Sequence, residues 1–134
     1  MDLGAVHAPR CQSQPIAVGL ASLDQESSDR ETIARLNDGL RTNGRNGRIV
    51  VTRGVHNLAH FEFDELARAL ATYDRFGTDN DPYGERDFGM FQLFGTKLMW
   101  KIDYYDLNLE FGSDDPANPD TTIRVLTVML ASEY

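Results

Sequence analysis

Apolar residues recur at helical spacing soon after the first quarter of the chain. A helix can be capped there by Ser28 or Asp29, and its apolar positions are Ile33, Leu36 and Leu40. Two Asn-Gly pairs within residues 42–47 favour positive φ angles and are expected to end the helix. The pattern therefore predicts one amphipathic helix that stops at the first Asn-Gly pair.

A strand and a second helix are predicted next. Residues 48–52 are compact and β-branched, which is typical of a strand. After a loop through His56 and His60, Asp64 can cap a helix over residues 65–73. The apolar face of that helix is formed by Leu66, Ala69, Leu70 and Tyr73.

A β-hairpin is predicted in the second half of the chain. Residues 88–94 and 97–106 are expected to be antiparallel strands joined by a tight turn at Gly95-Thr96. Alternation along the second strand predicts a core face of Leu98, Trp100, Ile102 and Tyr104. The same alternation predicts a solvated face of Met99, Lys101, Asp103 and Tyr105.

The last element has a mixed pattern. Asp120 or Thr121 can cap a helix, and helical spacing relates Ile123, Leu126, Leu130 and Tyr134. The β-branched residues within 123–128 leave a strand open, although the spacing favours the helix.

These elements predict one α+β domain over residues 29–134. We expect a small, mainly antiparallel sheet of three or so strands packed against two or three helices. Residues 1–28 contain Pro9 and Pro15 and lack a sustained period, which predicts a flexible or weakly docked N-terminal arm.

The net charge is unevenly distributed. The 134 residues carry a formal charge of −8, and residues 74–134 hold twelve acidic and five basic side chains. Such acidity argues against general adhesion to nucleic acid or to an anionic membrane. No apolar run approaches the roughly 20 residues that span a bilayer, and no secretory signal is evident, so we expect a cytoplasmic protein. Cys11 is the single cysteine, which excludes an intramolecular disulfide and a cysteine metal cluster.

Three segments resemble a known family. They are residues 80–89 (NDPYGERDFG), residues 100–106 (WKIDYYD) and residues 124–131 (RVLTVMLA), the last followed by Glu133-Tyr134. Together they resemble DUF3768, a bacterial domain of unknown function, from roughly residue 29 to the C-terminus. The resemblance implies a small cytoplasmic bacterial protein of a kind associated with plasmids and other mobile elements. It implies no catalytic residue.

The first acidic loop is a candidate metal site. Asp79, Asp81, Glu85 and Asp87 surround Gly84, and oxygen ligands on a turn-rich loop suit calcium or magnesium. The EF-hand pattern fails because Tyr83 and Met90 occupy its fifth and twelfth positions. The same carboxylates can cap turns or pair with Arg86, and this structural role is favoured over a metal site or a metal-assisted hydrolase.

Other polar groups give weaker indications of chemistry. Asp103 and Asp106 beside Tyr104 and Tyr105 could act as a general acid and base, but the strand pattern favours a surface or interface role. His56 and His60 lack the Glu of a zinc protease motif. Phosphate binding, and through it nucleic acid, is an alternative for four arginines: Arg41, Arg45, Arg48 and Arg53.

We expect a non-enzymatic acidic module that binds a protein with a basic surface. The predicted contact residues are Asp79, Asp81, Tyr83, Glu85, Asp103, Tyr105, Asp106, Asp114 and Asp115. A specific version is a mobile-element inhibitor of a host defence complex, of the anti-CRISPR or anti-restriction type, whose carboxylates mimic nucleic-acid phosphates. The metal site and the arginine segment remain the alternatives.

Overall fold

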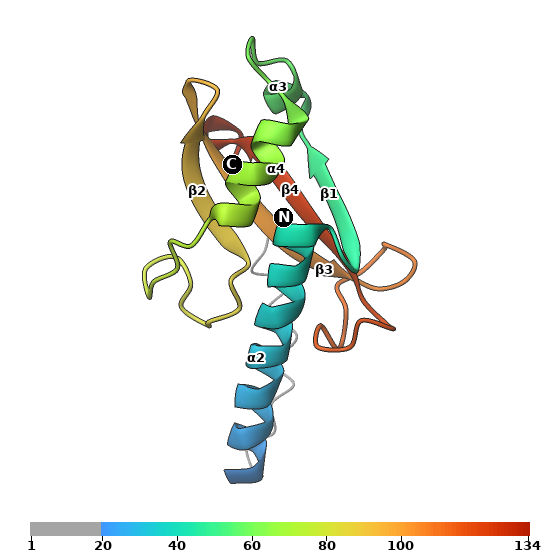
Figure 1. Ribbon diagram of the computed structural model, residues 1–134. Coiled ribbons are helices and arrows are strands. Elements are labelled where there is room, and N and C mark those ends of the chain that lie inside the picture. The colour runs from blue at the N-terminus through green and yellow to red at the C-terminus, as the bar shows by residue number, and fades with distance from the viewer. Residues whose placement is uncertain (1–19) are drawn as a thin grey trace.

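The computed structural model describes residues 20–134, with side chains from residue 28 onward. The helices are α2 (Leu20–Asn43), α3 (Arg53–His56) and α4 (Phe63–Thr72). The strands are β1 (Gly47–Val51), β2 (Phe88–Leu93), β3 (Thr96–Tyr105) and β4 (Ile123–Leu130), followed by the 3-10 turn η2 (Ala131–Glu133). Figure 1 shows α2 and α4 on one face of the sheet, which confirms the α+β class.

The sheet has four strands in the order β1-β4-β3-β2. β4 pairs antiparallel with β3 and parallel with β1, and β2 pairs antiparallel with β3. The sheet is therefore mixed, and it has one strand more than we predicted. The difference arises because residues 123–130 form a strand between β1 and β3.

The helix favoured for residues 121–134 is wrong. Burial along β4 follows a period of two over most of its length: Arg124, Leu126 and Val128 are buried, and the residues between them are partly exposed. The β-branched side chains fit the pleated surface between two neighbouring strands, and this packing outweighs the helical spacing of the leucines.

The core lies between the sheet and the two longer helices. The predicted core face of β3 is confirmed, because Leu98, Trp100, Ile102 and Tyr104 are each at most 1% exposed. They pair with Leu130, Val128, Leu126 and Arg124 of β4. The helices contribute Ile33 and Leu40 from α2 and Leu66 and Leu70 from α4.

The opposite face of β3 differs from the expectation. Asp103 is 1% exposed, and its carboxylate pairs with Lys101, whose side chain is 13% exposed. The prediction of a solvated face is therefore wrong for Asp103 and also for Met99, which is 1% exposed. A carboxylate with so little contact with water needs a cationic partner, and the lysine two residues earlier on the same strand face supplies it.

The helix ends follow the local sequence with two corrections. α2 ends at Asn43, and the predicted positive φ angles occur at Gly44 (72°) and Asn46 (61°). α2 begins at Leu20, so residues 20–28 of the predicted arm are helical; the rest of the arm lies outside the described residues. The cap of α4 is Glu62 rather than Asp64, because the Glu62 side chain accepts from the Glu65 backbone N–H at 2.8 Å.

The predicted hairpin is confirmed as β2 and β3. Its two-residue turn is Phe94-Gly95, with φ angles of 55° and 76°, as a type I′ turn requires. The loop predicted through His56 contains the short helix α3, which the Thr52 side chain caps. Among the described residues, no helix combines the length and the apolar character that a membrane crossing needs.

Candidate functional site

A buried polar network joins residues from the family-like segments. The Tyr104 hydroxyl donates to Glu85 Oε1 at 2.9 Å and accepts from Asn37 Nδ2 at 2.9 Å. Asn37 Nδ2 also donates to the Glu85 carbonyl, and Asn37 Oδ1 accepts from Arg124 Nε at 2.9 Å. Arg124 reaches the Pro116 carbonyl and lies 5.2 Å from the centroid of the Tyr104 ring. The network therefore links α2, β3, β4 and two loops.

The network has a structural role because solvent and ligands cannot reach it. Asn37, Glu85, Tyr104 and Arg124 are all 0% exposed. Burial removes the Arg124 guanidinium from water and thereby lowers its pKa, while the neighbouring Tyr104 acts in the opposite direction. The burial of Glu85 is a correction: this carboxylate cannot serve as a surface contact or as a ligand on an open loop.

The first acidic loop, residues 74–87, is held against α2. Asp81 Oδ1 accepts from the Arg86 backbone N–H at 2.9 Å, and the Arg86 guanidinium contacts both carboxylate oxygens of Asp38 at 2.9–3.1 Å. Burial raises the pKa of Asp81, although the Arg86 backbone hydrogen bond opposes the shift and nearby Asp87 adds to it. These contacts bear out the turn-capping interpretation for Asp81.

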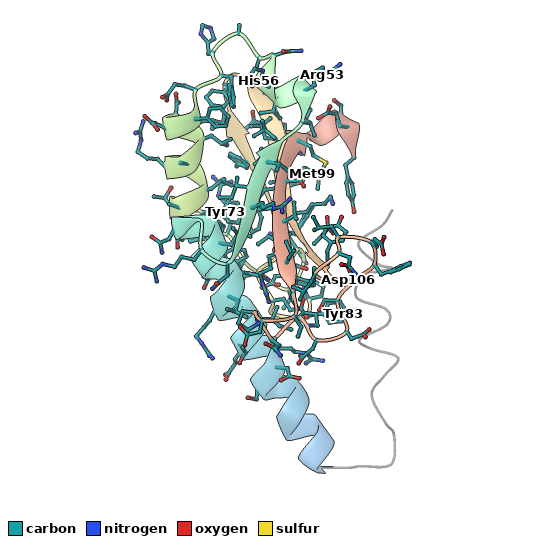
Figure 2. The ribbon with its side chains drawn as sticks, turned by 90° about the vertical axis from the view of Figure 1, so that its right-hand side faces the viewer. Arg53, His56, Tyr73, Tyr83, Met99 and Asp106 are labelled. Carbon is teal, nitrogen blue, oxygen red and sulfur yellow. The ribbon has the colours of Figure 1, made fainter. Side chains whose placement is uncertain are left out.

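The alternative metal site in this loop is not assembled. Within residues 20–134, no group of three or more His, Cys, Asp or Glu side chains is placed to hold a metal ion. Glu85 is buried and contacts Tyr104, whereas Asp79 is exposed. His56 and His60 do not share a helix face, because α3 ends at His56. In Figure 2, the labelled His56 lies far from the labelled Tyr83 of the first acidic loop.

A groove lies within the segment that connects β3 to β4. We call it the acidic groove; it has a volume of about 580 Å³. Its lining residues are Asp106, Leu107, Phe111, Gly112, Ser113, Asp114, Asp115, Asn118 and Thr121. The segment 106–123 that contains them has five acidic and no basic residues. Three of the predicted contact residues, Asp106, Asp114 and Asp115, therefore meet in one concave surface.

Local hydrogen bonds order the first wall of the acidic groove. Asp106 Oδ1 accepts from the backbone N–H groups of Asn108 (3.1 Å) and Glu110 (3.0 Å). The Asp106 N–H donates to the Phe111 carbonyl at 2.8 Å, and Leu109 has a positive φ of 59°. The Asp106 side chain thus stabilises a tight turn of the backbone, a common role of Asp in loops.

The second wall of the acidic groove is fixed by buried hydroxyls. Ser113 Oγ and Thr122 Oγ1 are 2.6 Å apart, and Ser113 Oγ accepts from the Asp115 N–H at 3.1 Å. Thr122 Oγ1 donates to the Asp115 carbonyl at 2.9 Å. Arg124 then connects this wall to the buried network through the Pro116 carbonyl. The carboxylates of Asp114 and Asp115 are consequently presented from an ordered backbone.

Large apolar side chains project beside these carboxylates. Phe111 is 71% exposed, Leu107 58% and Leu109 38%. Sequence reasoning missed them, although Leu-Asn-Leu-Glu-Phe between acidic residues alternates apolar and polar side chains without a core for the apolar ones. Exposed apolar groups gathered in one place commonly mark an interaction site.

The remaining predicted contacts are dispersed. Figure 1 shows loop 74–87 beside β2 and loop 106–122 on the other side of α2, so the two acidic loops lie apart. Tyr83 and Asp79 are exposed on the first loop, whereas Tyr105 is half-buried on the sheet. Asp103 is buried and is excluded as a surface contact.

The predicted arginine set is also divided. Arg41 is 6% exposed and donates to the carbonyls of Leu70 (2.8 Å) and Tyr73 (3.0 Å) at the end of α4. It also pairs with Asp38 at 3.0 Å, so it is a structural residue and cannot serve as a phosphate ligand. The other three, Arg45, Arg48 and Arg53, are exposed around β1.

Comparison with known proteins identifies a family and no function. A family model described as "Protein of unknown function (DUF3768)" matches residues 51–133. The match covers Glu85, Tyr104 and Arg124 of the buried network and the whole acidic groove, while Asn37 lies before it. Neither a curated protein nor a solved structure matches the chain.

Proposed function

The chain belongs to the DUF3768 family of unknown function, and we propose that it is a non-enzymatic acidic module that binds a protein with a basic surface through the acidic groove. The observation that carries the proposal is the coincidence of three carboxylates and two exposed apolar side chains in one ordered concavity. The carboxylates are Asp106, Asp114 and Asp115, and the apolar residues are Leu107 and Phe111.

The charge of the groove favours a basic partner. Five acidic residues within residues 106–123 have no basic residue among them, and the chain as a whole carries −8. Such a field attracts a Lys- or Arg-rich surface and repels an acidic one, which affects the association rate and the choice of partner more than affinity.

The apolar side chains supply the contact area that charge alone lacks. Phe111, at 71% exposed, leaves most of its ring in water, and its burial against a partner would be favourable. Aromatic side chains at the centre of an interface with a polar rim often contribute most of the binding energy. The groove combines an aromatic anchor with a carboxylate rim.

The order of the loops favours binding as well. The hydrogen bonds of Asp106, Ser113 and Thr122 hold both walls before any partner arrives. A preformed surface loses less conformational entropy on association than a loop that must fold around its partner.

A narrower form of the proposal concerns the class of partner. Carboxylates presented at fixed positions can compete with phosphates for the Lys and Arg side chains of a nucleic-acid-binding protein. We include in the proposal an inhibitor of such a protein, of the anti-CRISPR or anti-restriction type. The support for this form is the concentration of carboxylates in segment 106–123.

The test compares two variants that change the net charge equally. The groove variant carries Asp106→Asn, Asp114→Asn and Asp115→Asn, and Asn at 106 retains an oxygen that can accept the loop N–H groups. The control carries three exposed substitutions elsewhere: Asp64→Asn, Asp74→Asn and Asp79→Asn. Each tagged protein is used to capture partners from a lysate of the cells that encode it, at low and moderate salt.

We expect the wild type and the control to capture the same partner and the groove variant to lose it at least about tenfold. Phe111→Ser should weaken capture, whereas Phe63→Ser on α4, where the ring is 61% exposed, should not. Equal capture by both charge variants would refute the groove as the binding surface. For the inhibitor form, the captured partner should release a labelled DNA or RNA duplex when the protein is added.

A further inference from the structure

Strand β1 forms an uncovered edge of the sheet. It pairs on one side with β4, and no described strand lies on its other side. All residues from Gly47 to Val50 are exposed, with Ile49 at 40% and Val50 at 41%. Figure 2 is viewed towards this side of the molecule, and β1 runs across the front of it.

The backbone of β1 has hydrogen-bonding groups directed outward. The Thr52 N–H, just after the strand, donates to the Val128 carbonyl of β4 at 3.0 Å. Successive residues of a strand direct their N–H and C=O groups to opposite sides, so Ile49 and Val51 direct theirs away from β4. Within the described part of the chain, no partner is recorded for these outward groups.

The opposite edge of the sheet is covered at its centre, unlike β1. At β2, the Met90 N–H donates to the Tyr73 hydroxyl at 3.3 Å, and Phe91 is only 8% exposed. Tyr73, at the end of α4, therefore covers the β2 edge at Met90. Proteins usually cover an edge or shorten it, because an open one pairs with other strands.

The charge around β1 indicates which kind of strand would pair with this edge. Arg45 precedes the strand, Arg48 lies in it and Arg53 follows it, and all three are exposed. None of them forms an ion pair within the residues that the structure describes. A second copy of β1 would bring Arg48 towards its own counterpart and would be repelled, whereas an acidic strand would be attracted.

A small groove lies at the start of the same strand. It has a volume of about 300 Å³, and its lining includes Arg48, Leu107, Pro119 and Ile123. Leu107 is 58% exposed there. A strand placed beside β1 could therefore insert one apolar side chain at this end while its acidic side chains face the arginines.

We propose that the β1 edge binds an extended, acidic segment of a partner protein by strand addition. The partner backbone pairs with the outward groups of Ile49 and Val51, as in other complexes that extend a sheet. Acidic side chains of the segment contact Arg48 and Arg53. This site adjoins the acidic groove, with which it shares Leu107, and takes a partner of the opposite charge.

The test uses a seven-residue capped peptide that alternates valine and glutamate, and a matched peptide with lysine in place of glutamate. Amide hydrogen exchange is measured on the full chain. We expect the glutamate peptide, at about 1 mM, to slow exchange at Ile49 and Val51 at least about tenfold, and the lysine peptide to have no effect.

Two variants separate the contributions of charge and backbone. Arg48→Glu with Arg53→Glu should abolish protection by the glutamate peptide and permit protection by the lysine peptide. Ile49→Pro removes an outward N–H and leaves the ladder with β4 in place, so it should weaken peptide binding. Unchanged exchange with the glutamate peptide would overturn the proposal. Protection of the two amides that rises with protein concentration alone would overturn it in favour of self-association.

Discussion

Removal of one hydroxyl from the buried network should destabilise the fold strongly. Tyr104→Phe keeps the ring 5.2 Å from the Arg124 guanidinium and deletes a group that contacts both Glu85 and Asn37. Both lost hydrogen bonds measure 2.9 Å and connect side chains that are 0% exposed, so water cannot replace them in the native structure.

The magnitude follows from what each partner retains. Asn37 Nδ2 keeps its hydrogen bond to the Glu85 carbonyl at 2.9 Å. Losing its second hydrogen bond, to the Tyr104 hydroxyl, should therefore cost about 1 kcal/mol of stability, as for an ordinary hydrogen bond. Glu85 Oε1 loses a donor in a buried position, and a hydrogen bond to a carboxylate contributes about 1.5–3 kcal/mol. We expect a total loss of about 3 kcal/mol, or about 10 °C in Tm for a domain of this size.

Urea unfolding measured by tryptophan fluorescence checks this expectation, because Trp100 lies in the core. The matched control is Tyr105→Phe. Tyr105 is half-buried, and its hydroxyl makes no hydrogen bond within the described residues, so its loss should cost less than about 0.5 kcal/mol. Equal stability losses for the two variants would show that the network does not stabilise the fold.

Two further predictions concern the core and the first acidic loop. A Cβ at Gly89 would lie 2.5 Å from Trp100 Nε1 and from the Tyr73 ring, so Gly89→Ala should lower the free energy of unfolding by about 2–3 kcal/mol. Gly95 has a φ of 76° and open space around it, so Gly95→Ala should lower it by only about 1 kcal/mol. Urea unfolding of the two variants compares these losses. The raised pKa of Asp81 means that the folded state binds its proton more tightly, so wild-type stability should fall as pH rises from the ordinary aspartate pKa through the raised value. Asp81→Asn should lack that component of the pH profile, and identical wild-type and variant profiles in thermal melts would contradict it.

Local sequence patterns account for most element boundaries. The Asn-Gly pairs end α2, and the turn at Phe94-Gly95 lies one residue from the predicted position. The core face of β3 was predictable because alternation on a strand depends on the sequence alone. The helix α2 begins earlier than predicted. The sequence did not indicate this start, because residues 20–28 lack a sustained apolar period.

The character of β4 could not be predicted in the same way. The spacing of its apolar residues fits a helix, whereas its β-branched residues fit a strand. The local sequence therefore did not decide between the two structures. The sheet decided between them, because β4 lies between β1 and β3 and its backbone pairs on both sides. The candidate site had a similar limit: the sequence showed the acidic residues, but only their positions after folding showed which of them share a surface.

The sequence by itself determined the acidity of the second half, the hairpin and the family. The tertiary structure decided the role of each charge. Glu85 and Asp103 are buried, whereas Asp106, Asp114 and Asp115 line one groove. The physical reason is that the burial of a charge depends on contacts between segments that are distant in the sequence. Glu85 contacts Tyr104 of β3 and Asn37 of α2. Neither the residue types nor their separation in the sequence predicts these contacts.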